Sequence, residues 1–290
     1  MPEQLVSILM SVRNGADTIT GTIESVLAQT YTNWELVIRD NCSTDNTIEI
    51  IESFNDKRIH VIRNEFNMGS QFNFICLILT ANGNFIKTID DDSYLYPKCL
   101  EKQIEILESR PDIAFVTCDT EYRTPTGKTI KAKLPFKNDT ATRDEYIKFT
   151  LLTARGSVQE GNQTLYRTKL YKDAWKKLLA GGLEQGYINI YAPYFYLPSV
   201  LLLHGNLYII HETLSAGMIE SNSYSLKFNQ AKLLVAWIKL LRQDAYKISP
   251  FLYIWARIMI IIRATARRLA FKFLGRGTGA NNNSHFKKMI

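Results

Sequence analysis

Three adjacent carboxylates, Asp90, Asp91 and Asp92, directly follow the apolar run 85–89. Neighbouring ionised carboxylates raise one another's pKa, so the arrangement becomes favourable when a divalent cation lies among them. Oxygen ligands alone indicate a hard cation, Mg²⁺ or Mn²⁺, which keeps several waters and binds the phosphates of a substrate. This acidic triplet therefore predicts a metal site that takes a nucleotide carrying a diphosphate.

A second polar stretch, 40–45, also follows an apolar run and allows two compatible roles. Ser43 or Thr44 can cap the helix that begins there. Asp40 can accept a hydrogen bond from the imide N–H of uracil or thymine, and hydrogen-bond matching of this kind discriminates well between bases. A simpler role is likewise open for the acidic triplet, in which Asp92 or Ser93 caps a turn before Pro97 and the other carboxylates are solvated.

Around these stretches, short apolar runs alternate with segments of helical spacing. Strands are predicted at 6–11, 34–39, 59–63 and 85–89, and helices around 19–27, at 45–54 and at 70–80. Such alternation implies a parallel sheet with helices on both faces, and its ligand crevice lies beyond the carboxyl ends of the strands. The polar loops that follow these strands, at 13–14, 40–45, 64–69 and 90–92, are therefore expected to converge on one site.

The regular alternation stops in the second half of the chain. Further elements are predicted as a helix at 97–109, a strand at 114–118, a turn at 124–127 between two edge strands, and a helix around 170–179. The mixed pattern of 140–211 fits a substrate-facing half without a sheet of its own. We therefore expect a nucleotide-sugar-binding half (1–120), an acceptor-binding half of the same domain (121–215) and a helical basic region (216–290).

The motifs, taken in order, resemble those of the family 2 glycosyltransferases of the GT-A fold. The matching segments are Val6 to Asn14, Asp40 to Thr47, Asn67-Met68-Gly69, Ala81 to Ile86, Ile89 to Asp92, and Pro97. The resemblance covers residues 5–118 and keeps the family's order and spacing. It implies a mostly parallel sheet flanked by helices and a transferase that uses a nucleoside diphosphate sugar, usually with inversion at the anomeric carbon.

The resemblance also assigns roles to individual residues. Asp40 would hold the base, which favours a UDP-sugar, and Asp90 and Asp92 would form the DxD motif, with Asp92 as the most direct metal ligand. The cation would neutralise charge on the departing diphosphate, so Asp92 also counts as catalytic. The expected nucleotide contacts are Ser11, Arg13, Asn14, Asp40, Asn67, Asp90 and Asp91.

An inverting transfer also needs a general base, and here the chain departs from the family. Residues 201–205 resemble the end of a helix that in the family usually follows a Glu-Asp pair. In this chain Pro193 and Tyr194 occupy the positions of that pair. The sequence leaves two carboxylates as candidates for the base, Glu184 first and Glu160 second. Each can equally be a solvated surface acid.

The charge of the chain is concentrated in its last segment. Of 35 basic residues nine follow Asp244, where no acidic residue occurs, so the rest of the chain is nearly neutral. On a helical wheel, residues 249–274 place apolar side chains on one face and basic side chains on the other, which predicts an amphipathic basic helix. Their apolar runs are too short to cross a bilayer. This tail is expected to lie on an anionic membrane surface, or else to pack its apolar face on the protein. A nucleic-acid role fits worse, because the apolar stripe with Trp and Ile lies opposite the charge and offers no stacking platform interleaved with it.

The remaining features bound the setting. The four cysteines, Cys42, Cys76, Cys99 and Cys118, form no CxxC pair, and no signal-peptide pattern is present, so we expect a protein at the cytoplasmic face of the membrane. The expected acceptor is a glycan or lipid-linked saccharide in surface polysaccharide assembly. Two other classes of protein stay open, a nucleotidyltransferase and a non-catalytic glycan-assembly subunit. The lack of a Gly-rich phosphate loop at 13–16 argues against the nucleotidyltransferase.

Overall fold

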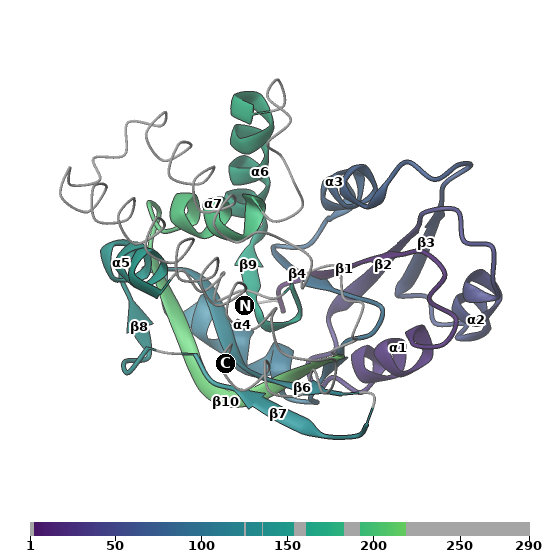
Figure 1. Cartoon of the computed structure of the whole chain (residues 1–290), viewed down its shortest axis with the longest axis horizontal. Helices are drawn as coiled ribbons and strands as arrows, with labels where there is room; N and C mark the ends of the chain where they lie inside the picture. Colours follow the sequence, from purple (N-terminus) through teal and green to yellow (C-terminus); the bar gives the residue numbers. More distant parts are fainter. Residues whose placement is uncertain (1–2, 125, 135, 154–160, 183–191, 219–290) are drawn as a thin grey trace, which may run out of the picture.

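The computed structural model describes residues 3–124, 126–134, 136–153, 161–182 and 192–218. Within them one sheet runs in the order β3-β2-β1-β4-β9-β6-β10-β5, with β7 on β6 and β8 on β10 (Figure 1). Its strands are β1 (Val6–Val12), β2 (Trp34–Asp40), β3 (Ile59–Arg63), β4 (Phe85–Ile89), β5 (Tyr94–Leu95), β6 (Ile113–Arg123), β7 (Thr129–Ala132), β8 (Thr140–Ala141), β9 (Leu165–Arg167) and β10 (Asn206–Met218). Strands β1 to β4 are parallel neighbours, as the sequence predicts.

Helices cover both faces of this sheet (Figure 1). They are α1 (Ile19–Leu27), α2 (Thr47–Ser53), α3 (Ser70–Thr80), α4 (Cys99–Ser109), α5 (Arg143–Thr153), α6 (Thr168–Gly182) and α7 (Ala192–Leu201). Side chains alternate between the faces of a strand, so Ile8 and Met10 of β1 pack with α1, α2 and α4, whereas Leu9 packs with α3, α5, α6 and α7. The two faces thus carry two separate apolar clusters.

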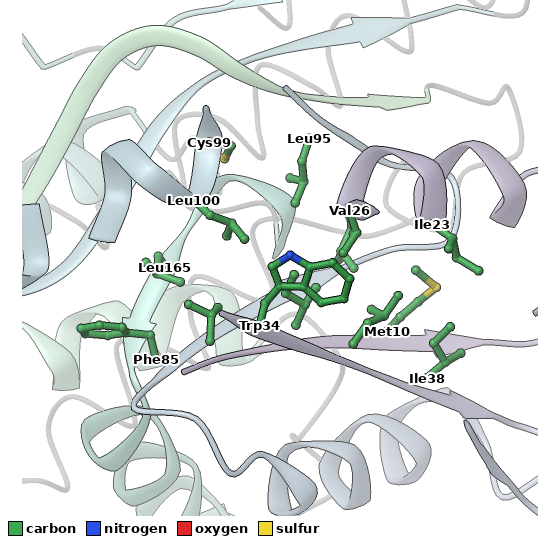
Figure 2. Packing of buried hydrophobic residues seen from close by; sticks show 14 of the residues in the cluster. Met10, Ile23, Val26, Trp34, Ile38, Phe85, Leu95, Cys99, Leu100 and Leu165 are labelled. Carbon is green, nitrogen blue, oxygen red and sulfur yellow. The ribbon is translucent and has the colours of Figure 1, made fainter. Parts of the chain in front are cut away.

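The apolar cluster under α1 and α4 packs these helices on one face of the sheet (Figure 2). Trp34 lies at its centre, with Met10 and Val26 nearby and Leu100 of α4 on its other side. Each of these side chains is almost completely buried. At about 25 cal/mol per Å² of apolar surface removed from water, this packing supplies the main force that holds the strand ends in place.

The first half of the chain follows the sequence closely. β3, α3 and β4 have the predicted bounds, β1 and β2 each extend one residue further, and α2 begins two residues later than expected, at Thr47. Short apolar runs between turn signals leave few alternatives for such elements.

Within the described residues, the second half forms no sheet of its own and contributes strands to the main sheet. β9 inserts between β4 and β6, antiparallel to both, and β10 pairs with β6 in parallel over most of its length. The strand predicted at 114–118 is longer and central in the sheet, and not an edge strand. β9 spans only three residues, Leu165–Arg167, too few for a two-residue period to be visible.

No helix within the part of the chain that the structure describes is long and apolar enough to cross a membrane. The predicted helix at 249–274 lies outside the described residues.

Candidate functional site

The loops after β1 and β2 are joined by hydrogen bonds at the carboxyl end of the sheet. The backbone N–H of Asn14 donates to Ser43 Oγ (2.8 Å), and Asn14 Oδ1 accepts from the N–H of Thr44 (2.9 Å). Next to them, the N–H of Gly15 donates to Thr47 Oγ1 (2.9 Å). Asn14 has a φ of 56°, a left-handed conformation that asparagine tolerates better than most residues. The two loops therefore form one polar rim.

Asparagine side chains connect this rim to the loop after β3. Asn41 donates through Nδ2 to Asn67 Oδ1 (2.8 Å), and its Oδ1 accepts from the N–H of Met68 (2.9 Å) and from Asn64 Nδ2 (3.2 Å). Asn41 and Asn64 are buried, while Asn67 is exposed. The predicted nucleotide contact Asn67 is thus positioned by residues that hold the interior of the site.

The same network continues into helix α3 through Asn73, which is completely buried. Asn73 Oδ1 accepts from Asn64 Nδ2 (2.7 Å), and its Nδ2 donates to Ser11 Oγ (2.7 Å) and to the carbonyl oxygen of Arg39 (3.0 Å). This asparagine network, Asn41, Asn64, Asn67 and Asn73, ties the ends of β1, β2 and β3 together. Ser11, a predicted nucleotide contact, is one of its acceptors.

The acidic triplet approaches the β1 loop through its middle residue. Asp91 Oδ2 accepts from Thr18 Oγ1 (3.1 Å), and the Asp91 carbonyl oxygen accepts from Thr22 Oγ1 (2.8 Å). A Cβ added to Gly15 would lie 2.5 Å from Asp91 Oδ2. Only glycine at position 15 allows this close approach, so Asp91 packs against the loop that the sequence assigns to the nucleotide.

Asp90 and Asp92 are the members of the triplet that the family resemblance assigns to a divalent cation. Asp90 is exposed and Asp92 is partly buried. Among the described residues, no three His, Cys, Asp or Glu side chains are grouped as a complete metal cage. Mg²⁺ and similar hard cations commonly take one or two carboxylates and complete their coordination with substrate phosphates and waters. Two carboxylates spaced as Asp90 and Asp92 are chemically suited to such a site.

The second half of the chain also supports the triplet. Asn162, in the short 3₁₀ helix Gly161–Gln163, donates through Nδ2 to Ser93 Oγ (3.3 Å) and to the carbonyl oxygen of Ala216 in β10 (2.9 Å). The Ser93 carbonyl oxygen in turn accepts from Thr22 Oγ1 (2.7 Å). The turn after β4 is therefore held between α1 and β10.

Asp40, which the sequence predicts to hold the base, has a hydrogen-bond partner within the protein. It is completely buried and accepts hydrogen bonds from the N–H (3.0 Å) and the hydroxyl of Ser43. These bonds fix the loop 41–44, in which Cys42 adopts a φ of 62°. In this geometry Asp40 shapes the loop, and direct contact with a base requires the loop to shift.

Asp45 stabilises the same rim from the start of α2. Its pKa is lowered from 3.8, first by the hydrogen bond from the Thr47 side chain; burial opposes this shift, and a hydrogen bond from the Ala16 N–H (3.2 Å) adds to it. The carboxylate therefore stays ionised and holds the β1 loop on the β2 loop.

The structure thus brings together most of the predicted site residues. Ser11 and Asp40 lie at the ends of β1 and β2, and Asn14, Asn67 and the acidic triplet lie on the loops next to these strand ends. Arg13 lies exposed beside Asn14. Glu184 and Glu160 lie outside the described residues. The sequence did not reveal the supporting residues Asn41, Asn64, Asn73, Thr18, Thr47 and Asn162.

This arrangement defines an α/β protein whose polar loops gather at the carboxyl ends of the parallel strands β1 to β4, the edge at which such sheets commonly bind ligands. The profile of the family described as Glycosyl transferase family 2 matches residues 7–173, more than half of the chain. The chain belongs to this family, which confirms the assignment made from its motifs.

Curated relatives agree with the family. The E. coli proteins WfaP and WfgD, each named UDP-Glc:alpha-D-GlcNAc-diphosphoundecaprenol beta-1,3-glucosyltransferase, are 39% identical to the chain over 106 and 107 residues. The matched part covers 37% of this chain and 42% of each relative. The putative teichuronic acid biosynthesis glycosyltransferase TuaG of Bacillus subtilis is 31% identical over 185 residues, covering 61% of this chain and 73% of TuaG.

Solved structures show the same fold. The match with TarS 1-349 of S. aureus in complex with UDP-GlcNAc has a TM-score of 0.61 at 18% identity. It covers 82% of this chain and 67% of the TarS chain. The match with the mannosyltransferase PcManGT of Pyrobaculum calidifontis, in complex with GDP-Man and Mn²⁺, has a TM-score of 0.60 at 16% identity. It covers 96% of this chain and 77% of the PcManGT chain. The expected GT-A fold is confirmed.

Proposed function

We propose that this protein transfers a sugar from a nucleoside diphosphate sugar, with a UDP-sugar favoured, to a glycan or lipid-linked saccharide in surface polysaccharide biosynthesis. The observation that carries the proposal is the junction of the loops after β1, β2 and β3 with the acidic triplet after β4, joined through Asn14, Asn41, Asn73 and Asp91. Family membership and the printed activities of WfaP and WfgD support it.

The donor would lie across this junction. Asp90 and Asp92 would hold Mg²⁺ or Mn²⁺, a choice supported by the Mn²⁺ bound in the structurally similar PcManGT. When bound, the cation supplies positive charge that stabilises the departing diphosphate. Ser11, Arg13, Asn14 and Asn67 would contact the nucleotide, and Asp91 would keep the β1 loop in position for them.

Base recognition is assigned to the loop after β2. Asp40 would accept the imide N–H of uracil once the loop 41–44 shifts, and until then its bonds to Ser43 hold the carboxylate in one orientation. The structure of TarS with UDP-GlcNAc supports a uridine donor, whereas that of PcManGT with GDP-Man shows that the fold also takes guanosine.

The acceptor hydroxyl must lose its proton during an inverting transfer. We assign this step to Glu184, with Glu160 as the second candidate, because Pro193 and Tyr194 occupy the positions of the usual acidic pair. We also propose that the protein works at the cytoplasmic face of a membrane, with the basic segment 249–274 on the lipid surface.

A transfer assay tests the proposal. The full chain is incubated with UDP-Glc, UDP-GlcNAc or GDP-Man and a synthetic GlcNAc-diphospho-polyprenol, with Mn²⁺ or with EDTA, and both nucleotide release and labelled lipid are measured. We expect transfer from one UDP-sugar, its loss in EDTA, and a loss of at least about a hundredfold in Asp92→Ala. The control is Asp112→Ala, whose carboxylate pairs with Arg110 at the opposite end of the sheet.

Nucleotide binding without release from any donor would contradict the proposal and favour the non-catalytic assembly subunit. Release that is unaffected by both EDTA and Asp92→Ala would refute the metal-dependent mechanism.

A further inference from the structure

The outer face of α3 is apolar and exposed. Residues 66–84 contain no charged side chain. α3 turns Asn73, Leu77 and Ile78 toward the sheet, which leaves Phe72 (59% exposed) and Leu79 (61% exposed), seven positions apart, on the side that faces away from it. Phe66, in the loop just before α3, is 66% exposed. These are the three most exposed large apolar side chains in the described part of the chain.

Lysines of helix α6 flank this face. Lys172 Nζ donates to the carbonyl oxygens of Leu79 (3.2 Å) and Ala81 (2.8 Å) at the end of α3. Lys169 and Lys176 lie three and four positions from Lys172, on the same side of α6, and both are exposed. Between Thr168 and Gly182 the helix carries four lysines and one aspartate. Figure 1 shows α3 and α6 on the same side of the sheet.

The apolar face begins at the rim of the candidate site. Phe66 is adjacent to Asn67, which is bonded to Asn41 within the asparagine network. A surface that contacts Phe66 and Phe72 therefore lies next to the loop after β3. Any lipid-borne substrate held at that surface would be close to the donor site.

We propose that Phe66, Phe72 and Leu79, together with Lys169 and Lys176, form a docking surface for an anionic lipid bilayer. Exposed apolar side chains enter the boundary between headgroups and acyl chains, while neighbouring lysines contact lipid phosphates. The surface would hold the donor site against the membrane that carries the acceptor. Only this last consequence rests on the proposed function, because binding to vesicles requires neither donor nor acceptor.

Charge distinguishes the bilayer from two other partners. The segment 219–290 has thirteen basic residues and two acidic ones, Glu220 and Asp244, so it offers little opposite charge to the α6 lysines. A second copy of the chain would bring a second set of lysines to the interface, whereas lysine is depleted in protein–protein interfaces. Anionic lipid complements both the lysines and the apolar face.

Vesicle co-sedimentation of the full chain tests the inference. Vesicles of phosphatidylcholine alone are compared with vesicles that contain one third phosphatidylglycerol. We expect Lys169→Gln/Lys176→Gln to weaken binding to the anionic vesicles roughly 30-fold, and Phe72→Ser/Leu79→Ser to weaken it by about tenfold or more. The matched controls are Lys128→Gln/Lys131→Gln beside and within β7 and Met218→Ser at the end of β10, all of them exposed.

Three results would overturn the inference: no vesicle binding by the wild-type chain, equal binding by both double variants and their controls, or equal binding to neutral and anionic vesicles. Dissociation of an oligomer by Phe72→Ser/Leu79→Ser in light scattering would assign the face to a second copy. A lower unfolding temperature of that variant with unchanged vesicle binding would assign it to the segment 219–290. Nucleotide binding by calorimetry is expected to stay at the wild-type level in both double variants, which separates this inference from the proposed function.

Discussion

Replacing Asn73 by alanine removes the link between α3 and the ends of three strands. Asn73 is completely buried and makes three hydrogen bonds, to Asn64, Ser11 and the carbonyl oxygen of Arg39. Alanine keeps the helix, since it is the best helix former, and removes only the amide. The substitution therefore measures what the asparagine network contributes.

The expected loss follows from the bonds themselves. Each buried hydrogen bond contributes a net ~0.5–1.5 kcal/mol, and partners left unsatisfied add their desolvation penalty. For the three bonds of Asn73 we expect the free energy of unfolding to fall by about 2–4 kcal/mol. Because Asn64 and Ser11 position the loops of the site, nucleotide affinity should fall as well.

Urea unfolding followed by circular dichroism measures the effect, with a lower midpoint at an unchanged m-value as the expected result. The control is Asn46→Ala, since Asn46 precedes α2 without a capping side-chain hydrogen bond and should change stability by no more than about 0.5 kcal/mol. Equal stability of Asn73→Ala and Asn46→Ala would refute the reasoning. A double-mutant cycle with Ser11→Ala should show coupling of about 1 kcal/mol.

Two further predictions concern the β1 loop. Gly15→Ala would place a Cβ 2.5 Å from Asp91 Oδ2, so we expect about 1–3 kcal/mol of destabilisation in thermal unfolding. The control Gly21→Ala, with open space around the added Cβ, should cause no destabilisation. Equal melting temperatures of the two variants would contradict this prediction. Thr47→Val should raise the pKa of Asp45 toward 3.8 in a carboxyl NMR titration. Because the folded-state pKa is lowered, Asp45 stabilises the fold above pH ~3.8 and loses this effect as the pH falls through the folded value. An unchanged Asp45 titration in Thr47→Val would show that the hydroxyl is not the cause.

The sequence predicted those parts of the fold that local patterns specify. β3, α3 and β4 are short apolar segments between turn signals, and their bounds agree with the structure. Local periodicity does not reveal β9, because its three residues, Leu165–Arg167, form a strand by pairing with β4 and β6. Tertiary pairing and not local propensity decides such elements.

The site was predicted as a set of loops but not as a network. The acidic triplet was visible because its carboxylates suit a cation that binds a diphosphate. The Asn-x-Gly segment was visible because its residue types suit a tight turn. Asn73 was missed because a single polar residue in a helix usually faces solvent. One signal was present: Asn73 lies four positions before the apolar Leu77, on the same helical face. The sequence also did not reveal that Asp91 turns toward Thr18 and Gly15.

Calorimetric titration with UDP, GDP and dTDP, with and without Mn²⁺, tests most directly the claim that the loops after β1 to β4 form a metal-dependent nucleotide site. It is carried out on the wild type, on Asp92→Ala and on the control Asp112→Ala. We expect one nucleotide, UDP, to bind with an affinity that Mn²⁺ increases, and we expect Asp92→Ala but not Asp112→Ala to abolish that increase. Absence of binding by folded wild-type protein, or full metal-dependent binding by Asp92→Ala, would contradict the claim.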